Sequence, residues 1–309
     1  LNVDSAVRTI SDYLENSWTS DNTEVLNLET QVTEPEGSAE ELANIKDLLG
    51  SFTTSFSTSG SNRCKNVSSG ASHINGTVLY PGEEFSAYET VSPFTEANGY
   101  AMAGSYLNGE VVDSMGGGIC QVSTTLYNAV LRAELNVTER SPHSMTVHYV
   151  DLSEDAAIAG TYKDFKFVNS TEYPIYIEGY TTSDKKITFN IYGKETRDKN
   201  RTISFESQMV SETPATTILQ EDAGQGIGYK AVSSKGSSGY VAELYKIVKV
   251  NGVETDRIKV NKSTYKGTNR VVTYGTAGDP TLSENLRAAI AAQDEALADA
   301  NIAAAVPAQ

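Results

Sequence analysis

Histidine and cysteine, the side chains that most often hold transition metals in proteins, are scarce in this sequence. Its 309 residues include three histidines and two cysteines. These five residues follow none of the spacings by which proteins bind zinc. We therefore expect no metal site, and nothing in the sequence indicates a cofactor.

Positive charge is also scarce, with 24 lysine and arginine residues against 40 aspartate and glutamate residues. The formal net charge is −16, and such a surface repels phosphate backbones and anionic headgroups, so we do not expect nucleic acid as a partner. Long hydrophobic runs are missing as well. No stretch approaches the ~18 apolar residues that a membrane span needs, so we expect no transmembrane segment within these residues.

The remaining composition indicates a folded protein of several domains. A hydrophobic fraction of 39% is ordinary for a globular protein, and one domain usually takes roughly 100–200 residues. Because the sequence begins at Leu1 rather than at a methionine, we expect that a preceding segment is missing. Changes of sequence pattern divide the chain into four parts: 1–50, 51–195, 200–278 and 279–309.

The first part, residues 1–50, is typical of a small α/β segment. Apolar residues at helical spacing predict a helix over 3–14, and a run of valines and leucines predicts a strand over 25–32. A capping-box pattern followed by Gly50 predicts a second helix over 38–49.

Residues 115–135, MGGGICQVSTTLYNAVLRAEL, are the most informative segment. Three glycines precede a run with helical periodicity, which places Cys120 in the first turn of a helix with a buried face. The positive end of the helix dipole stabilises a thiolate there and lowers the pKa of the cysteine. Strand patterns follow over 145–150, 164–168, 173–180 and 185–193. We therefore predict an α+β fold in which the helix that carries Cys120 packs on an antiparallel sheet.

Residues 200–278 predict an elongated all-β module with little core of its own. The pair Asn251-Gly252, between two strand-like runs, is a strong hairpin signal. Beyond it, the alanine-rich tail over 279–309 is compatible with either a helix or disorder.

The segment GGGICQVSTTLYNAVLRAELNVTERSPHSMTVHYV closely resembles the VanW-like family, which is named for an accessory gene of vancomycin-resistance clusters. The blocks FSTSGSNRCKN, INGTVLYPGEEFS and FKFVNSTEYPIYI agree with it, and the resemblance covers about residues 51–193. Residues 1–50 resemble part of the peptidoglycan-binding domain that often precedes VanW regions. Residues 202–275 resemble the G-five domain, which is implicated in binding polymers that contain N-acetylglucosamine. The resemblance implies an extracellular protein of the cell wall or cell surface of a Gram-positive bacterium.

Cys120, His143 and Asp155 occur in the chain order of papain-like and transglutaminase-like enzymes. In those enzymes a thiolate attacks an acyl carbon, a histidine moves the proton and an acidic residue orients the ring. We favour His143 over His148 as the base because it lies in the family-like block RSPHS. Substrate-binding candidates around this trio are Gly117, Gly118, Gln121, Arg140, Ser144 and His148.

Several alternatives remain open at this point. Cys120 is a nucleophile, a buried inert thiol, or half of a disulfide with Cys64. Gln121 is an oxyanion donor or a solvated polar residue, and Arg140 binds a substrate carboxylate or pairs with a local acid such as Glu139 or Asp155. Tyrosines of the β module either stack on sugar rings or form cross-strand pairs. These tyrosines are Tyr229, Tyr240, Tyr245 and Tyr265.

Two classes of function therefore follow from the sequence. In the first, the protein binds peptidoglycan or its amino-sugar backbone and a cysteine-dependent domain performs acyl transfer or amide hydrolysis on peptide stems. In the second, it is a noncatalytic surface scaffold or adhesin in which every domain binds N-acetylglucosamine-containing glycans. The geometry around Cys120 discriminates between them, because only the first requires a histidine beside the thiol.

Overall fold

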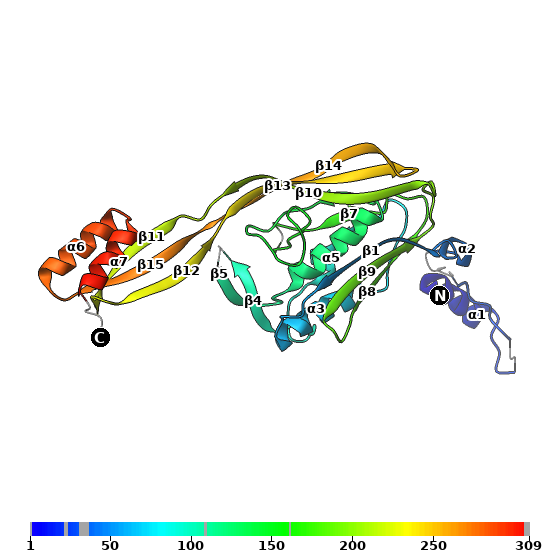
Figure 1. The fold of residues 1–309 in the computed structure, drawn as a ribbon. Helices are drawn as coiled ribbons and strands as arrows, with labels where there is room; N and C mark the ends of the chain where they lie inside the picture. The colour runs from blue at the N-terminus through cyan, green and yellow to red at the C-terminus, as the bar shows by residue number, and fades with distance from the viewer. Residues whose placement is uncertain (1, 22–23, 31–36, 108–109, 161, 306–309) are drawn as a thin grey trace. The chain divides into compact units, whose positions relative to one another are not determined.

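The computed structural model describes residues 2–21, 24–30, 37–107, 110–160 and 162–305. The chain divides into two compact units, residues 1–43 and residues 44–309. Figure 1 shows the course of the chain and labels most of its helices and strands.

The first unit contains α1 (Val3–Asn16) and α2 (Ala39–Leu42). The capping box expected at the start of the second helix is present: the Ser38 hydroxyl accepts from Glu41 N, and the Glu41 carboxylate accepts from Ser38 N. Each bond satisfies a backbone donor that a helix N-terminus otherwise leaves unpaired.

Two elements expected near the N-terminus do not form as the local pattern indicates. Residues 24–30 form no strand, and the rest of the strand expected over 25–32 lies outside the described residues. The helix expected over 38–49 ends at Leu42, and β1 (Asp47–Ser55) begins shortly after it. The residues of β1 form a strand instead of a helix because their backbone hydrogen bonds to a strand more than a hundred residues later outweigh the helical pattern.

A four-stranded antiparallel sheet forms the centre of the second unit. Its strand order is β1-β9-β8-β2, and the turn over 182–185 joins the β8–β9 hairpin as the sequence predicts. Strand β1 lies at one edge of the sheet and pairs with β9. The sheet therefore joins segments that are far apart in the chain. The other strands are β9 (Lys186–Gly193), β8 (Ile175–Thr181) and β2 (Thr77–Leu79).

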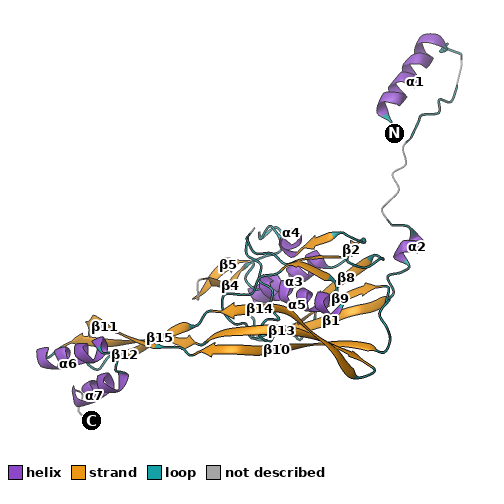
Figure 2. Cartoon of the chain, turned by 90° about the horizontal axis from the view of Figure 1, so that it is seen from above, coloured by secondary structure: helices purple, strands orange, loops and turns teal. Residues whose placement is uncertain are grey.

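Two helices cover this sheet, α5 (Ile119–Arg132) and α3 (Ser61–Ile74). Figures 1 and 2 show both helices against the strands, and α5 contacts β1 and β9 while α3 contacts β8. Almost every side chain of α5 is buried, because α3 and the loop that follows Tyr149 enclose the faces that the sheet leaves uncovered. The prediction of a cysteine-bearing helix on an antiparallel sheet is confirmed.

Smaller elements surround this helix and sheet core. A three-stranded sheet has the order β3-β7-β6, and β4 pairs with β5 in a hairpin next to the glycine turn. Their bounds are β3 (Glu84–Ser86), α4 (Ala87–Val91), β4 (Met102–Leu107), β5 (Glu110–Met115), β6 (Asn136–Glu139) and β7 (Lys166–Val168).

The strand expected over 145–150 is wrong, because these residues form an irregular loop. The local alternation of polar and apolar residues suits a strand, but a strand also needs a neighbour to pair with. None of residues 145–150 pairs with a strand, and the loop instead lines a cavity with Val147, His148 and Tyr149.

The β module consists of two three-stranded sheets that share three long ribbons of chain. Strand order is β10-β13-β14 in one sheet and β11-β15-β12 in the other. Each ribbon leaves one sheet and enters the other after one to three residues. Neither sheet has a second layer within the module that would bury one of its faces. The strands are β10 (Arg201–Thr213), β11 (Thr217–Gly226), β12 (Lys230–Ser237), β13 (Gly239–Val250), β14 (Val253–Tyr265) and β15 (Thr268–Ala277).

Each end of the module gains its apolar contacts from elsewhere in the unit. Leu244 belongs to the core under α5, with Phe205 and Val260 packed against it. At the other end the tail is helical, as α6 (Pro280–Ala291) and α7 (Glu295–Ala305) pack on β11 and β15. The structure therefore resolves the two readings of the tail in favour of helices. In the described part of the chain, no helix combines the length and hydrophobicity that crossing a bilayer requires.

Glu134, just after α5, joins this helix to the β module. Its carboxylate accepts hydrogen bonds from both terminal nitrogens of Arg201 in β10 and from Lys246 in β13. Burial alone would raise the pKa of Glu134, but the two cations outweigh it and lower the pKa to about 2.

We predict that Glu134→Gln lowers the free energy of unfolding by about 1.5–3 kcal/mol at pH 7, because it removes charged hydrogen bonds at a largely buried position. Glu134 has a lower pKa in the folded state, so its contribution is present above about pH 4.5 and is lost as the pH falls towards 2. Urea unfolding at pH 7 and pH 3 measures both effects. Glu206→Gln, which removes an exposed ion pair with Arg257, is the control and costs much less, because solvent screens the pair; equal losses in the two variants would contradict the prediction.

Candidate functional site

The glycine turn brings Cys120 to the first turn of α5, as the sequence predicts. Gly118 is the N-cap with φ 109°, a left-handed conformation that other residues rarely adopt. Gly117 lies against β4, where an added Cβ would come within 2.3 Å of Ala103 O. Cys120 Sγ lies 3.3 Å from the carbonyl oxygen of Ile158, to which the thiol can donate.

His143 and Asp155 meet Cys120 at this point. Asp155 Oδ2 lies 2.7 Å from His143 Nδ1 and also accepts from the backbone His143 N at 2.6 Å. The imidazole of His143 and the thiol of Cys120 line the same cavity, and each shifts the pKa of the other. The structure therefore brings together the three residues that sequence order selected, in the succession carboxylate, imidazole and thiol.

The three pKa values shift in the directions that a thiolate and imidazolium pair requires. Burial acts to raise the pKa of Cys120, but the hydrogen bond and charge of His143 lower it overall. Burial acts to lower the pKa of His143, but Asp155 and Cys120 raise it to about 9. Burial opposes ionisation of Asp155 too, yet the bonds and charge of His143 hold the pKa of this carboxyl below its usual range.

Asp155 is a buried carboxylate that accepts from four donors. Besides the two bonds from His143, its Oδ1 accepts from Arg140 Nη2 at 3.0 Å and from Tyr265 Oη at 2.5 Å. Arg140 also donates to the carbonyl oxygens of Asp155 and Ser153 and to Ser263 Oγ. Arg140 thus takes the role of a partner for a local acid, and its guanidinium is occupied within the protein rather than facing a ligand.

Tyr265 and Ser263 belong to β14, so the β module supplies part of this carboxylate's surroundings. The Tyr265 hydroxyl accepts from Ser153 N at 2.7 Å while it donates to Asp155. Asn261 of the same strand donates to Ser153 O at 3.0 Å. Tyr265 is only 3% exposed. Tyr265 therefore cannot stack on a sugar ring. Of the four tyrosines considered for that role, Tyr229 is the one with an exposed side chain.

Gln121 is buried beside the thiol and has no donor left for an oxyanion. Its Nε2 donates to Thr54 Oγ1 and to Ser55 O, each at 2.9 Å. Its Oε1 accepts from Arg63 Nη2 at 2.8 Å. Gln121 therefore braces Arg63 against β1, which is a different role from the one that sequence reasoning considered.

The remaining candidates lie around two adjoining cavities. Cys120, His143 and Gly118 line a cavity of about 310 Å³. His148 is exposed and lines a wider one of about 930 Å³, so it is not the imidazole beside the thiol. Ser144 is exposed, and its carbonyl oxygen accepts from Lys266 N.

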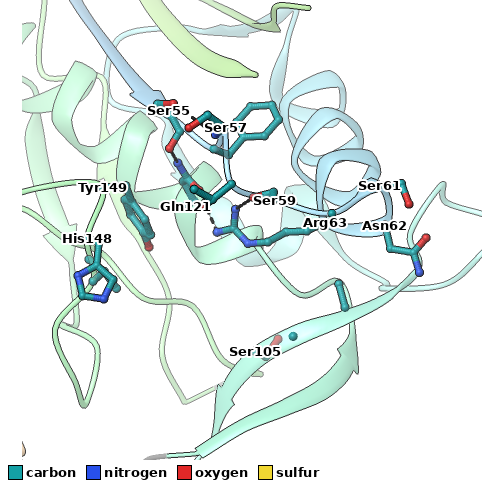
Figure 3. A pocket seen from close by; sticks show the side chains of 16 residues that line it. Ser55, Ser57, Ser59, Ser61, Asn62, Arg63, Ser105, Gln121, His148 and Tyr149 are labelled. Carbon is teal, nitrogen blue, oxygen red and sulfur yellow. Dashed lines mark hydrogen bonds between the residues drawn. The ribbon is translucent and has the colours of Figure 1, made fainter. Parts of the chain in front are cut away.

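Figure 3 shows the wider cavity, with Arg63 reaching towards Gln121 and with Tyr149 and His148 coming from the loop on one side. Arg63 and Tyr149 line both cavities and were missed by sequence reasoning. Their distance along the chain from Cys120 hides them, although Arg63 lies inside the block FSTSGSNRCKN that carries the family resemblance.

The structure excludes one alternative for the thiol, because Cys64 and Cys120 are both free. Cys64 lies on α3, with its Sγ 3.5 Å from Ser59 O. Within the described ranges, no group of three or more His, Cys, Asp and Glu side chains is arranged to hold a metal ion.

We predict that Tyr265→Phe lowers the free energy of unfolding by about 1.5–3 kcal/mol, because it removes a buried donor from the charged Asp155 carboxylate. Tyr245→Phe is the matched control, since Tyr245 donates to Glu243 at the partly exposed face of the same module, where water replaces the lost bond and the loss of stability is smaller. Urea unfolding of both variants measures the difference. A Tyr265→Phe variant as stable as the Tyr245→Phe control would contradict the assigned bond.

Comparisons with known proteins match two successive parts of the second unit. Residues 62–192 match the family model described as VanW like protein, and residues 206–277 match that of the G5 domain. The structure described as "IgA1 Protease G5 domain structure" is 24% identical and covers 27% of this chain and 100% of its own, with a TM-score of 0.21.

Two curated relatives match the first of these regions. The "Uncharacterized protein YoaR" of Bacillus subtilis (strain 168) is 40% identical over 144 residues, which cover 46% of this chain and 48% of that protein. The "Vancomycin B-type resistance protein VanW" of Enterococcus faecalis (strain ATCC 700802 / V583) is 29% identical over 138 residues, which cover 42% and 49%. The chain thus spans about half the length of these relatives. Its domains fit a cell-wall-associated protein, and the chain carries a VanW-like domain followed by a G5 domain.

Proposed function

We propose that this protein is an exported cell-wall protein that binds peptidoglycan and uses Cys120 for acyl transfer or amide hydrolysis on peptide stems. One observation carries the proposal: a thiol with a lowered pKa lies beside an imidazole that a buried carboxylate orients, and thiol and imidazole line the same cavity.

The first chemical step uses the thiolate and the protonated ring. Cys120 Sγ attacks the carbonyl carbon of an amide, and a carbon–sulfur bond forms. The carbon–nitrogen bond then breaks as His143 gives its proton to the leaving amine, which leaves a thioester on Cys120. Asp155 stays ionised throughout and stabilises the imidazolium.

The second step decides between transfer and hydrolysis. An amine of a second peptide or a water molecule attacks the thioester, and neutral His143 takes the proton from it. The carbon–sulfur bond breaks and restores the thiolate and imidazolium pair. Transfer and hydrolysis therefore use the same residues and differ in which acceptor reaches the cavity.

The start of α5 also suits the oxyanion that forms in each step. In the first turn of α5, Ile119 N donates to Gly116 O and Gln121 N donates to Gly118 O, so these two N–H groups are already paired. The helix dipole is positive there. Cys120 is the second residue of α5, so the attacked carbonyl lies next to this turn and the positive end of the dipole stabilises its oxyanion.

Peptidoglycan is the substrate that the domain content favours. VanW and G5 domains fit a cell-wall-associated protein, and the two curated relatives come from Bacillus subtilis and Enterococcus faecalis. We extend this to an extracellular location on a Gram-positive cell, with N-acetylglucosamine-containing glycans as partners. The peptidoglycan-binding role of residues 1–50 stays a prediction.

A second candidate, a noncatalytic scaffold that recognises amino-sugar polymers, is favoured by the G5 domain together with Tyr229, which is 40% exposed. An exposed aromatic ring offers a flat apolar surface for a sugar. In this alternative the paired thiol has no chemical role, so its reactivity separates the two candidates.

We predict that iodoacetamide alkylates native Cys120 with a pH midpoint below the ~8.5 of an ordinary thiol. His143→Ala should move the midpoint to higher pH, because it removes the hydrogen bond and charge that stabilise the thiolate. Labelling of the Cys64→Ser protein, followed by mass spectrometry, measures the rate at each pH. Absence of labelling until the protein is denatured would identify Cys120 as an inert core residue.

We further predict that the protein forms a thioester with peptidoglycan peptides and releases an amine. Cys120→Ala should lower product formation at least about a thousandfold, and His143→Gln by a similar factor, because the residues act as a unit. Intact-protein mass and chromatography of the peptides measure adduct and product. Unchanged glycan binding by Cys120→Ala serves as the folding control, and equal product from wild type and Cys120→Ala would favour the scaffold.

A further inference from the structure

Arg63 is a cation whose charge no acidic side chain of the described residues neutralises by an ion pair. Its Nη1 donates to Ser59 Oγ at 2.7 Å and its Nη2 donates to Gln121 Oε1 at 2.8 Å, and both acceptors are neutral. These bonds use two of the five donors of a guanidinium. Arg140 differs in this respect, since it pairs with Asp155.

The position of Arg63 ties it to the candidate nucleophile. It lies in the first turn of α3, and a Cβ on Gly118 would meet its Cγ at 2.9 Å and its Nε at 3.2 Å. Its stem therefore rests on the turn that leads into Cys120. Gln121, the residue after Cys120, holds the guanidinium from the other side.

The residues that line the two cavities beside Arg63 differ in charge from the rest of the chain. None of the described residues that line them is aspartate or glutamate, although the chain has 40 such residues and a net charge of −16. Their ionisable nitrogen groups are Arg63, His143 and His148. Hydroxyl side chains surround Arg63 in the wider cavity, namely Ser55, Ser57, Thr58, Ser59, Ser61 and Ser105.

We propose that Arg63 binds a carboxylate of the peptide substrate next to the carbonyl group that Cys120 attacks. A guanidinium presents paired donors that match the two oxygens of a carboxylate, and Gln121 and Ser59 hold it in one orientation before the substrate arrives. Arg63 lines both cavities. A carboxylate bound to it therefore lies in one cavity while the attacked carbonyl lies in the other. This inference rests on the proposed function, because it assigns the substrate group that the same site recognises.

A pair of alkylating reagents tests the inference. Iodoacetate and iodoacetamide both transfer their methylene carbon to a thiolate and release iodide, and they differ in carrying a carboxylate or a neutral amide. The ratio of their rate constants with Cys120, divided by the ratio for a small thiol, measures attraction of a carboxylate to the site. In the Cys64→Ser protein we expect Arg63→Gln to lower this ratio about tenfold.

Matched variants separate charge from structural damage. Arg63→Lys keeps the charge and should retain most of the ratio. Lys65→Gln removes a cation from an exposed position of the same helix that lines neither cavity, and should leave the ratio unchanged. The rate with iodoacetamide reports whether the thiol itself is intact in each variant. An unchanged ratio in Arg63→Gln, with an intact iodoacetamide rate, overturns the inference.

A binding measurement keeps the test independent of the nucleophile. N-acetylalanine and its amide are titrated by ligand-observed NMR into the full chain with Cys120→Ser. We expect the acid to bind at least about fivefold tighter than the amide, and Arg63→Gln to abolish this preference. If Cys120 fails to react but the preference is found, the proposed function fails while the carboxylate site stands. Equal binding of acid and amide overturns the carboxylate site.

Discussion

The buried carboxylate of Asp155 is the interaction on which the candidate site depends. An ionised carboxylate is expensive to bury unless hydrogen bonds replace the lost water, and here His143, Arg140 and Tyr265 supply them. His143 and Arg140 come from the loop that follows β6 in the VanW-like domain, and Tyr265 comes from a strand of the G5 domain. Satisfying one carboxylate therefore fixes the imidazole that faces Cys120 and also docks β14 against the same loop.

The docking gives the G5 domain a structural role besides any ligand that it binds. Its two sheets have no layered core, so their apolar contacts come from the core under α5 at one end and from α6 and α7 at the other. Glu134 adds a charged clamp between α5 and this domain. The VanW-like and G5 domains consequently share buried polar groups, which is unlike two modules connected by a free linker.

Charge is distributed unevenly in this acidic protein. Asp155 is buried with its donors, while the described residues that line the two cavities include arginine and histidine and no aspartate or glutamate. Such a cavity favours the thiolate form of Cys120 and attracts anionic groups. The same local field thus supports both the nucleophile and the carboxylate subsite that we propose.

Local chemistry in the sequence determined the start of α5, the placement of Cys120 in its first turn and the Asn251-Gly252 hairpin, because glycine conformations and helical periodicity act over a few residues. The sequence order of Cys120, His143 and Asp155 also matches the order of thiol, imidazole and carboxylate in the folded site. Tertiary structure alone decided the rest. Within residues 145–150, Val147, His148 and Tyr149 became part of a cavity wall instead of a strand. Gln121 became a brace for Arg63, and Tyr265 became a donor to Asp155, because hydrogen-bond partners distant in sequence are brought together only when the chain folds.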